Sequence, residues 1–294
     1  MDLLGGILSW RRSVRQHPGG PGAGIDMRIM GRCLIILVLG CGLALRTAQA
    51  ETPEYGTFAF VDPTGTRLLA LTDLKHPERV RAALCSGGRR LLAQFELRQE
   101  GMQAHDGRDL AYNFHNQPGD VFRLPQGKAR ADETCFLAED TLVSAGKLRS
   151  VQPAVPADCP QGEQERLALA KRRRVQNCWR IARVSSDKQV LLIEFAREGP
   201  EALASIVLVG SQTAIFHDYP AEYRGEGHDL WRVEDAGALH PEDFRVLFVI
   251  EGQSFSAIGI SWAGSEGESL SLAVAKDGQQ FQQAQNGYRY WVPR

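Results

Sequence analysis

The sequence lacks the short motifs that specify most catalytic and metal sites. It has no C-x-x-C pair and no H-E-x-x-H or H-x-H spacing, so nothing indicates a zinc ribbon, a thioredoxin-like redox site or a zinc protease. Residues 259–263 come close to the G-x-S-x-G nucleophile elbow, but a turn-forming segment follows where that motif needs a helix. We therefore expect Ser261 to be an ordinary strand residue and the protein to be noncatalytic.

A hydrophobic run long enough to cross a membrane is also missing. The longest one, residues 33–45, has 13 residues, whereas a spanning helix needs roughly 20. Arg28 and Arg32 precede the run, and Ala48-Gln49-Ala50 follows it, so the segment resembles a bacterial secretory signal peptide with an A-x-A cleavage site. We predict a disordered upstream extension at 1–26, a signal peptide at 27–50 and a mature chain from Glu51, with the choice between Met1 and Met27 as the start left open.

Lipidation is the alternative fate of this segment. Residues 38–41 loosely resemble a lipoprotein cleavage box, in which Cys41 would be acylated. The apolar run continues through Leu45, where a lipoprotein would become polar, and this argues against lipidation. We expect membrane contact only through the transient signal peptide.

Strong positive charge is absent from the mature chain. Residues 51–294 contain 28 basic and 33 acidic side chains, a formal net charge of −5. Nucleic-acid binding requires a basic surface, so we exclude nucleic acid as a partner. The basic run Lys171–Arg174 is interpreted as the solvated face of a helix predicted at 161–176.

Cysteine is scarce, but its number is informative. Once the signal peptide is removed, the mature chain keeps Cys85, Cys135, Cys159 and Cys178. An even number in an exported chain predicts two disulfides. Three pairings are possible, and we favour Cys85–Cys135 with Cys159–Cys178, because each closes a loop of moderate length. The predicted location is the periplasm or the extracellular medium.

What the mature chain does have is short β-prone segments separated by turns. Spacing this short predicts an all-β fold of two tandem, duplicated β-sandwich or barrel-like domains, at 51–150 and 178–294, joined by a Pro-rich connector with a basic helix at 151–177. A hairpin is predicted at 55–71, a short helix from Pro77 towards Gly87, and an Asp-Gly turn at 277–278. Other strands are predicted at 91–97, 110–114, 121–124, 134–137, 141–144, 179–184, 189–195, 205–209, 214–217, 230–233, 245–250, 255–262, 270–275 and 288–292.

The duplication hypothesis rests on five matches in the same order. Residues 95–101 match 193–199 at an offset of 98, and the offset rises steadily to 113 where 142–146 match 255–259. We interpret the repeated positions structurally: each Pro ends a strand, each Asp accepts turn amides, and each Arg lies along its aromatic neighbour. These positions are His115, Pro118, Asp120, Arg123, Pro220 and Arg232.

Two functions fit these observations. The first is a noncatalytic exported β-protein, without a cofactor, that binds an envelope or extracellular protein, a glycan or another envelope component. All four Trp residues of the mature chain lie in 178–294, where they would form an aromatic contact surface. The second is a hydrolase that depends on zinc or another divalent metal, because loops could bring His217, His228, Asp229 and His240 to one ion.

Overall fold

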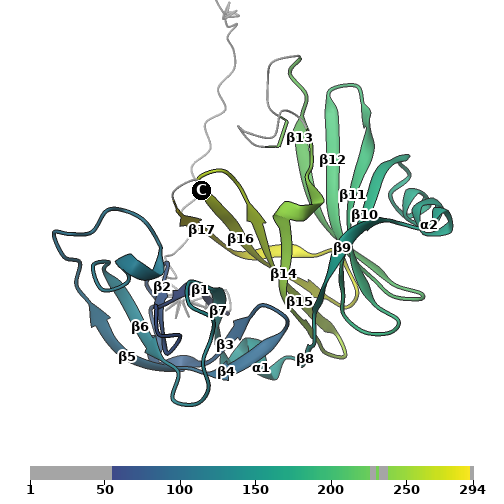
Figure 1. Ribbon diagram of the computed structural model, residues 1–294. Helices are drawn as coiled ribbons and strands as arrows, with labels where there is room; N and C mark the ends of the chain where they lie inside the picture. Colours follow the sequence, from purple (N-terminus) through teal and green to yellow (C-terminus); the bar gives the residue numbers. More distant parts are fainter. Residues whose placement is uncertain (1–54, 226–229, 232–237, 292–294) are drawn as a thin grey trace, which may run out of the picture. The chain divides into compact units, whose positions relative to one another are not determined.

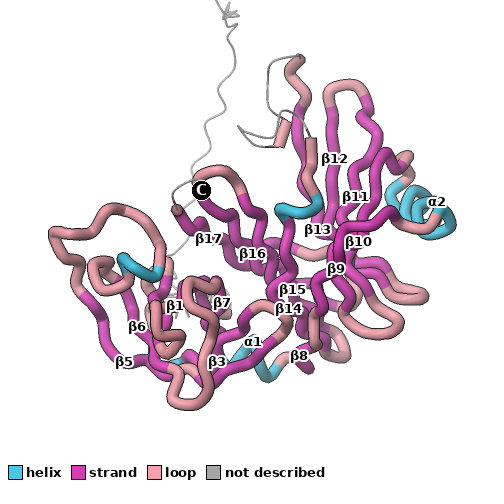
Figure 2. The backbone as a smooth tube through the Cα atoms, viewed as in Figure 1, coloured by secondary structure: helices cyan, strands magenta, loops and turns pink. Residues whose placement is uncertain are grey.

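The computed structural model describes residues 55–225, 230–231 and 238–291. Every described residue belongs to one compact unit, which lies within Glu51–Arg294. The predicted extension, the signal peptide and Cys41 thus lie outside the described residues. Within the described part, no helix is long and apolar enough to cross a bilayer. The compact unit is mainly β, as predicted, and all its sheets are antiparallel (Figure 1; Figure 2).

The first part of the described chain forms one seven-stranded sheet with the order β4-β3-β7-β1-β2-β6-β5. The predicted hairpin at its centre is confirmed, because β1 and β2 pair antiparallel across a turn. The elements of this part are β1 (Gly56–Val61), β2 (Arg67–Ala70), η1 (Pro77–Arg79), β3 (Val80–Cys85), β4 (Arg89–Leu92), β5 (Gln94–Gln99), η2 (Ala111–Asn113), β6 (Gly119–Arg123), β7 (Thr134–Glu139) and α1 (Asp140–Ser144).

The rest of the chain forms two five-stranded sheets. The outer sheet has the order β13-β12-β11-β10-β9, and the middle sheet has the order β17-β16-β15-β14-β8. Their elements are β8 (Lys147–Arg149), β9 (Gln152–Asp158), α2 (Gln161–Lys171), β10 (Val175–Arg183), β11 (Gln189–Glu198), β12 (Glu201–Val209), β13 (Ala214–Glu222), η3 (Pro241–Asp243), β14 (Phe244–Glu251), β15 (Phe255–Ala263), β16 (Gly267–Lys276) and β17 (Gln282–Tyr290).

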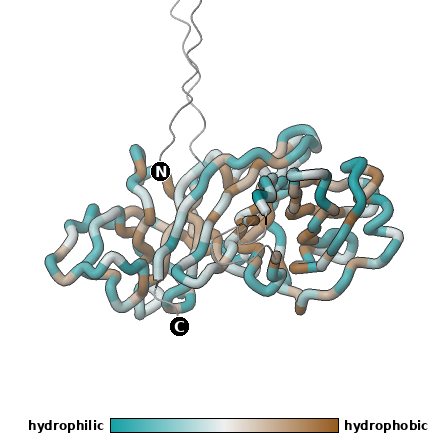
Figure 3. The backbone as a smooth tube through the Cα atoms, turned by 90° about the horizontal axis from the view of Figure 1, so that it is seen from above, coloured by the Kyte–Doolittle hydropathy of each residue, from teal (hydrophilic) through white to brown (hydrophobic). Residues whose placement is uncertain are grey.

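The middle sheet is covered on both faces. On one face, Val249, Ile258 and Ile260 pack against the outer sheet, so these two sheets form a sandwich. On the other face, Phe248 packs against Phe136 of the seven-stranded sheet, with ring centroids 5.8 Å apart. Figure 3 shows hydrophilic residues mainly at the periphery of the backbone and hydrophobic ones mainly in its interior.

The far face of the outer sheet is covered by α2. Leu191 and Ile193 of β11 point to this face, while Val190 and Leu192 point into the sandwich. Because both faces of β11 are buried, its sequence is continuously apolar from Val190 to Ile193. Leu167 of α2 packs on the same far-side cluster. The only hydrophobic side chain that α2 buries is thus Leu167, and most of its surface faces solvent.

Both predicted disulfides are confirmed. Cys85 and Cys135 are opposite residues of the paired strands β3 and β7, with Cα atoms 4.3 Å apart. Cys159 and Cys178 join the segments that flank α2, with Cα atoms 5.4 Å apart. All four cysteines are buried. Two buried disulfides indicate an oxidising, extracellular type of environment.

The predicted helix after Pro77 is wrong. Only a single 3₁₀ turn, η1, forms there, and β3 begins at Val80. The alanine-rich sequence of β3 suits a helix locally, but its backbone pairs with β4 on one side and β7 on the other. Sheet pairing and burial outweigh the small differences in helix propensity.

Three other secondary-structure predictions need correction. The strand expected at 110–114 is the 3₁₀ turn η2, after which Phe114 packs on Phe60 at 5.7 Å between ring centroids. The strand expected at 141–144 is α1, which buries Leu142 in the core. Leu230 and Trp231 are not in a strand, and the rest of that predicted strand lies outside the described residues.

Helix α2 also ends earlier than predicted, at Lys171. Arg172 has a φ of 53°, a left-handed cap that stops the helix. Lys171 lies 2.5 Å from a carboxylate oxygen of Asp218, and Arg173 donates to the carbonyl of Ala196 at 2.9 Å. The predicted solvated helix face is therefore wrong, because only Lys171 of the basic run lies in α2, and Lys171 and Arg173 make contacts within the protein.

The described strands do not repeat. The first part folds into one seven-stranded sheet and the second into two five-stranded sheets, and α1 occupies the place that β15 holds in the predicted alignment. Phe114 follows a 3₁₀ turn, whereas its predicted counterpart Phe216 lies inside β13. β8, predicted in the first domain, pairs with β14, and β9 of the predicted connector pairs with β10. The two-domain division stays a prediction.

Candidate functional site

An open pocket of about 350 Å³ lies at the margin of the sandwich, on the face of the middle sheet that is turned to the outer sheet. Four aromatic side chains from four segments of the chain line it, and we call it the aromatic pocket. Its lining residues are Tyr219, Trp231, Ile260, Trp262, Ser269, Leu270, Ser271, Gln283, Asn286, Gly287 and Tyr288.

Strand register explains the order of side chains on the pocket floor. Trp262 of β15 is opposite Ser269 of β16, which is opposite Tyr288 of β17, so one row of the sheet has an aromatic residue at each end. In the next row, Ser271 lies between Ile260 and Asn286. Since residues opposite each other on antiparallel strands project to the same face, each row presents its side chains together.

The aromatic wall is fixed by ring contacts. The Trp262 ring stacks on Phe244 with centroids 4.6 Å apart, and it meets the edge of Tyr219 at 5.7 Å. Tyr219 and Trp231 also pack against the sandwich core. Tyr288, at the opposite side of the floor, is 51% exposed. The pocket therefore offers rigid aromatic faces on one side and an accessible tyrosine on the other.

Among the described residues, the lining of the aromatic pocket carries no carboxylate, ammonium, guanidinium or imidazole group. The nearest described imidazole in sequence is His217, which is 5% exposed and contacts Tyr219 with ring centroids 4.9 Å apart. Burial lowers the pKa of His217, although Asp218 and the backbone of Phe281 act in the opposite direction. This surface therefore suits an uncharged ligand with apolar faces and hydrogen-bonding groups.

The residues predicted for a metal site are not brought together in the described part. His217 is buried in β13, whereas His240 precedes η3 with its side chain 55% exposed, next to Glu242. His228 and Asp229 lie outside the described residues. Among the described residues, the one cluster of three or more potential ligands is Cys85, Cys135 and Glu133, and its cysteines are joined in a disulfide.

The repeat-signature residues take structural roles that differ from one another. Asp120 is fully buried in β6, where it accepts the Leu74 amide at 3.1 Å and an Arg98 nitrogen at 2.8 Å. Arg123 donates to the side-chain oxygen of Gln94 at 2.8 Å. The predicted strand end at Pro220 is wrong.

The two prolines of the repeat signature differ in their position relative to a strand. Pro118 precedes β6, but Pro220 lies within β13, paired with Leu203. Such a position is tolerated because β13 is an edge strand. His115 is exposed against the ring of Phe114, and Arg232 lies outside the described residues.

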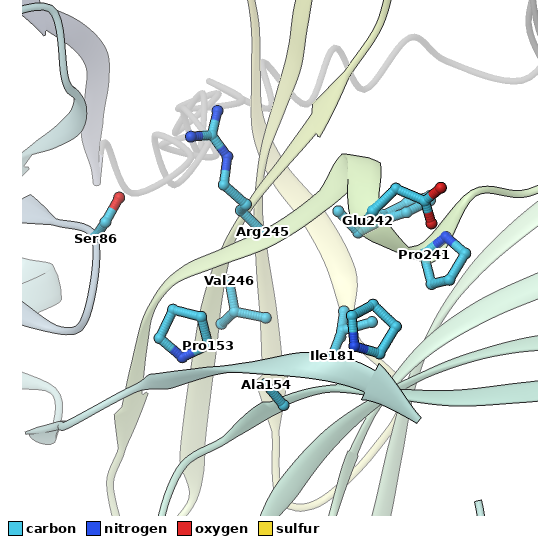
Figure 4. A pocket seen from close by; sticks show the side chains of 10 residues that line it. Ser86, Pro153, Ala154, Ile181, Pro241, Glu242, Arg245 and Val246 are labelled. Atoms are coloured by element: carbon cyan, nitrogen blue, oxygen red, sulfur yellow. The ribbon is translucent and has the colours of Figure 1, made fainter. Parts of the chain in front are cut away.

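A second, smaller cavity of about 210 Å³ lies beside β9 and β14. Figure 4 shows Pro153 and Val246 along it, with Arg245 directed away from Val246. Its volume falls below the roughly 300–1,000 Å³ of typical ligand pockets. Its lining residues are Ser86, Pro153, Ala154, Pro156, Ile181, Pro241, Glu242, Phe244, Arg245 and Val246.

The sequence predicts an aromatic surface within residues 178–294, where the pocket lies, but it does not indicate the polar residues of the pocket. Ser269, Ser271 and Asn286 belong to the pocket only because of strand register, which the sequence does not give directly. The clustering of Trp residues after 178 was the available signal.

No protein-family model, curated protein or solved structure matches the chain. The ligand of the aromatic pocket must therefore be inferred from the residues that line it.

Proposed function

We propose that the protein is an exported, noncatalytic binding protein that recognises a neutral glycan in the aromatic pocket. The observation that carries this proposal is the combination of aromatic rings with serine and amide side chains in an uncharged lining. The two disulfides and the predicted signal peptide support export to the periplasm or the extracellular medium.

A neutral sugar matches both parts of the lining. Its C–H faces can pack on the rings of Trp262 and Tyr288, which combine a large apolar surface with little conformational freedom. Its hydroxyl groups can pair with Asn286, Gln283 and the serines, because amides and hydroxyls both donate and accept hydrogen bonds. A charged ligand would find no counter-charge among the lining residues that the structure describes.

Glycan binding should be tested with the purified chain 51–294 on an array of neutral oligosaccharides, followed by calorimetric titration of the best ligand. Tyr288→Ala removes an exposed ring from the pocket, and we expect affinity to fall about tenfold, which corresponds to about 1.4 kcal/mol. Asn286→Ala should weaken binding as well, because it removes an amide from the pocket floor.

Tyr112→Ala is the matched control, because Tyr112 is 60% exposed and lies outside the aromatic pocket. It should leave affinity unchanged. Absence of binding to every neutral glycan, or equal affinity of the Tyr288→Ala variant and the unmodified chain, would overturn the proposal. Binding of a quaternary ammonium compound in place of sugars would assign the aromatic rings to cation recognition instead.

A further inference from the structure

Strand β10 contains a bulge that places two arginines on one face. Arg180 is opposite Leu191 and Ala182 is opposite Val190, so Ile181 is an extra residue in β10. In a regular strand, residues three apart point to opposite faces, but one extra residue restores them to the same face. Ile181 and Ala182 accordingly both belong to the sandwich core, and Arg180 and Arg183 line a pocket on the far side.

The pocket lined by these arginines has a volume of about 350 Å³ and lies beside α2, at one end of the outer sheet. We call it the arginine pocket. Unlike the aromatic pocket, it is lined mostly by polar and charged groups. Its lining residues are Glu163, Arg180, Arg183, Ser185, Ser186, Asp187, Lys188, Gln189, Val209, Gly210 and Ser211.

The acidic side chains of the arginine pocket are engaged with other groups. Glu163 accepts from Arg166 at 2.6 Å, and Asp187 accepts from Ser185 at 2.9 Å. Lys188 pairs with Glu251. Within the part of the chain that the structure describes, no carboxylate pairs with Arg180 or Arg183. Neither guanidinium group is therefore neutralised by a direct ion pair among the described residues, although the carboxylates of Glu163 and Asp187 also line the pocket.

Arg180 shows that an acceptor is missing. Its Nε atom is buried, and no protein acceptor within the described ranges takes its hydrogen bond. A buried donor without an acceptor costs free energy, so such atoms are rare unless water, an ion or a ligand satisfies them. A guanidinium group presents paired N–H donors whose spacing matches the oxygens of phosphate, sulfate or carboxylate.

From this geometry we infer a binding site for a tetrahedral oxyanion, phosphate or sulfate, in the arginine pocket. Arg180 and Arg183 supply the charge, and the hydroxyls of Ser186 and Ser211 supply further donors around it. The oxyanion is either a free inorganic ion or the substituent of a larger envelope molecule. The site is separate from the aromatic pocket and shares no lining residue with it.

The test is calorimetric titration of the chain 51–294 with sodium phosphate and sodium sulfate, with sodium chloride at equal ionic strength as the reference. We expect saturable binding of phosphate or sulfate. Arg180→Gln should weaken it at least tenfold, and Arg180→Lys should weaken it too, since lysine keeps the charge but loses the Nε donor. Arg174→Gln, at an exposed arginine outside the pocket, is the matched control and should leave affinity unchanged.

Thermal unfolding provides a second readout, because a ligand that binds the folded state raises the midpoint temperature. Phosphate should raise it for the unmodified chain and for Arg174→Gln, but not for Arg180→Gln. Tighter binding of a sugar phosphate than of inorganic phosphate would identify a substituent on a larger molecule, and equal binding would identify the free ion. Absence of saturable binding at millimolar concentrations of either anion, or equal affinity in Arg180→Gln, would overturn the inference. Tyr288→Ala should not change anion binding, so this result is independent of the glycan proposal.

Discussion

Arg289 on β17 donates from Nη1 to the hydroxyl of Thr134 on β7 at 2.9 Å, which joins the middle sheet to the seven-stranded sheet. The same guanidinium donates to the backbone oxygens of Asp109 and Asp132, both at 2.8 Å. Fully buried Glu268 accepts from Thr134 and from Ser261 and lies 3.1 Å from Arg245. Ser261 is thus a buried strand residue, as predicted, with its hydroxyl engaged in this network.

We expect Arg289→Met to lower the free energy of unfolding by about 3–5 kcal/mol, because it leaves one buried and two partly buried acceptors without their donor and removes a positive charge 3.8 Å from buried Glu268. Urea denaturation measures this change. Arg90→Met is the matched control, at an exposed position of β4, and should change stability by about 0.5 kcal/mol or less. Equal losses in the two variants would mean that the network contributes nothing to stability.

The sequence allowed prediction of features that depend on local pattern. The alternation of β15 and β16, the Asp277-Gly278 turn and the cysteine pairing around α2 all follow from residues close in the chain. In the turn, Asp277 and Gly278 have φ values of 52° and 69°, as an Asp-Gly hairpin requires.

Features that depend on distant residues could not be predicted. β3 has a helix-like local sequence and becomes a strand through pairing with β7, about 50 residues away. The bulge at Ile181 leaves no clear trace in the sequence, yet it decides the face on which Arg183 lies. The apparent duplication failed because β segments of similar composition occur in sheets of different topology.

His217 should make the protein sensitive to mild acid. Burial lowers its pKa in the folded state, so between that value and the ordinary pKa of about 6.5 the unfolded chain binds more protons. The free energy of unfolding therefore has its full value above about pH 6.5. It falls as the pH drops towards the folded-state pKa, by no more than about 1.4 kcal/mol per pH unit for one proton.

Urea denaturation between pH 5 and 8 measures this dependence. His217→Gln should remove this component of the slope, whereas His240→Gln, at an exposed imidazole, should retain it. Parallel stability curves for the unmodified chain and His217→Gln would show that the buried imidazole does not govern the response.

The two disulfides should differ in their contribution to stability. Cys85–Cys135 spans a sequence separation of 50 and Cys159–Cys178 one of 19. Loss of loop-closure entropy in the unfolded chain then predicts a cost of about 4 kcal/mol for the first pair and about 3 kcal/mol for the second when each is replaced by two alanines. Urea denaturation of the two double variants compares them, and a larger cost for the second pair would contradict the entropic account.

Export should be visible at the amino terminus. If residues 27–50 are a signal peptide, protein recovered from the periplasm or medium of a bacterial host should begin at Glu51. Edman sequencing and intact mass measure this directly. Ala50→Leu alters the small residue before the predicted cleavage site and should cause the uncleaved form to accumulate, whereas Thr47→Ser should be processed normally. Unmodified protein that retains residues 27–50 would contradict the prediction.

Gly259 is the first residue of the segment that resembles a nucleophile elbow, and packing against Phe248 explains why a glycine stands there. A Cβ atom at this position would lie 2.3 Å from the ring of Phe248, which is fully buried and has little room to move. Gly259→Ala should therefore destabilise the protein by about 1–3 kcal/mol, the usual cost of overpacking a core. Gly162→Ala is the matched comparison, because Gly162 lies in α2 with no atom within 4 Å of a Cβ. It should raise stability by about 0.5 kcal/mol through better helix propensity. Opposite signs for the two substitutions in urea denaturation would identify contact with Phe248 as the reason for glycine at 259, and a neutral Gly259→Ala would refute it.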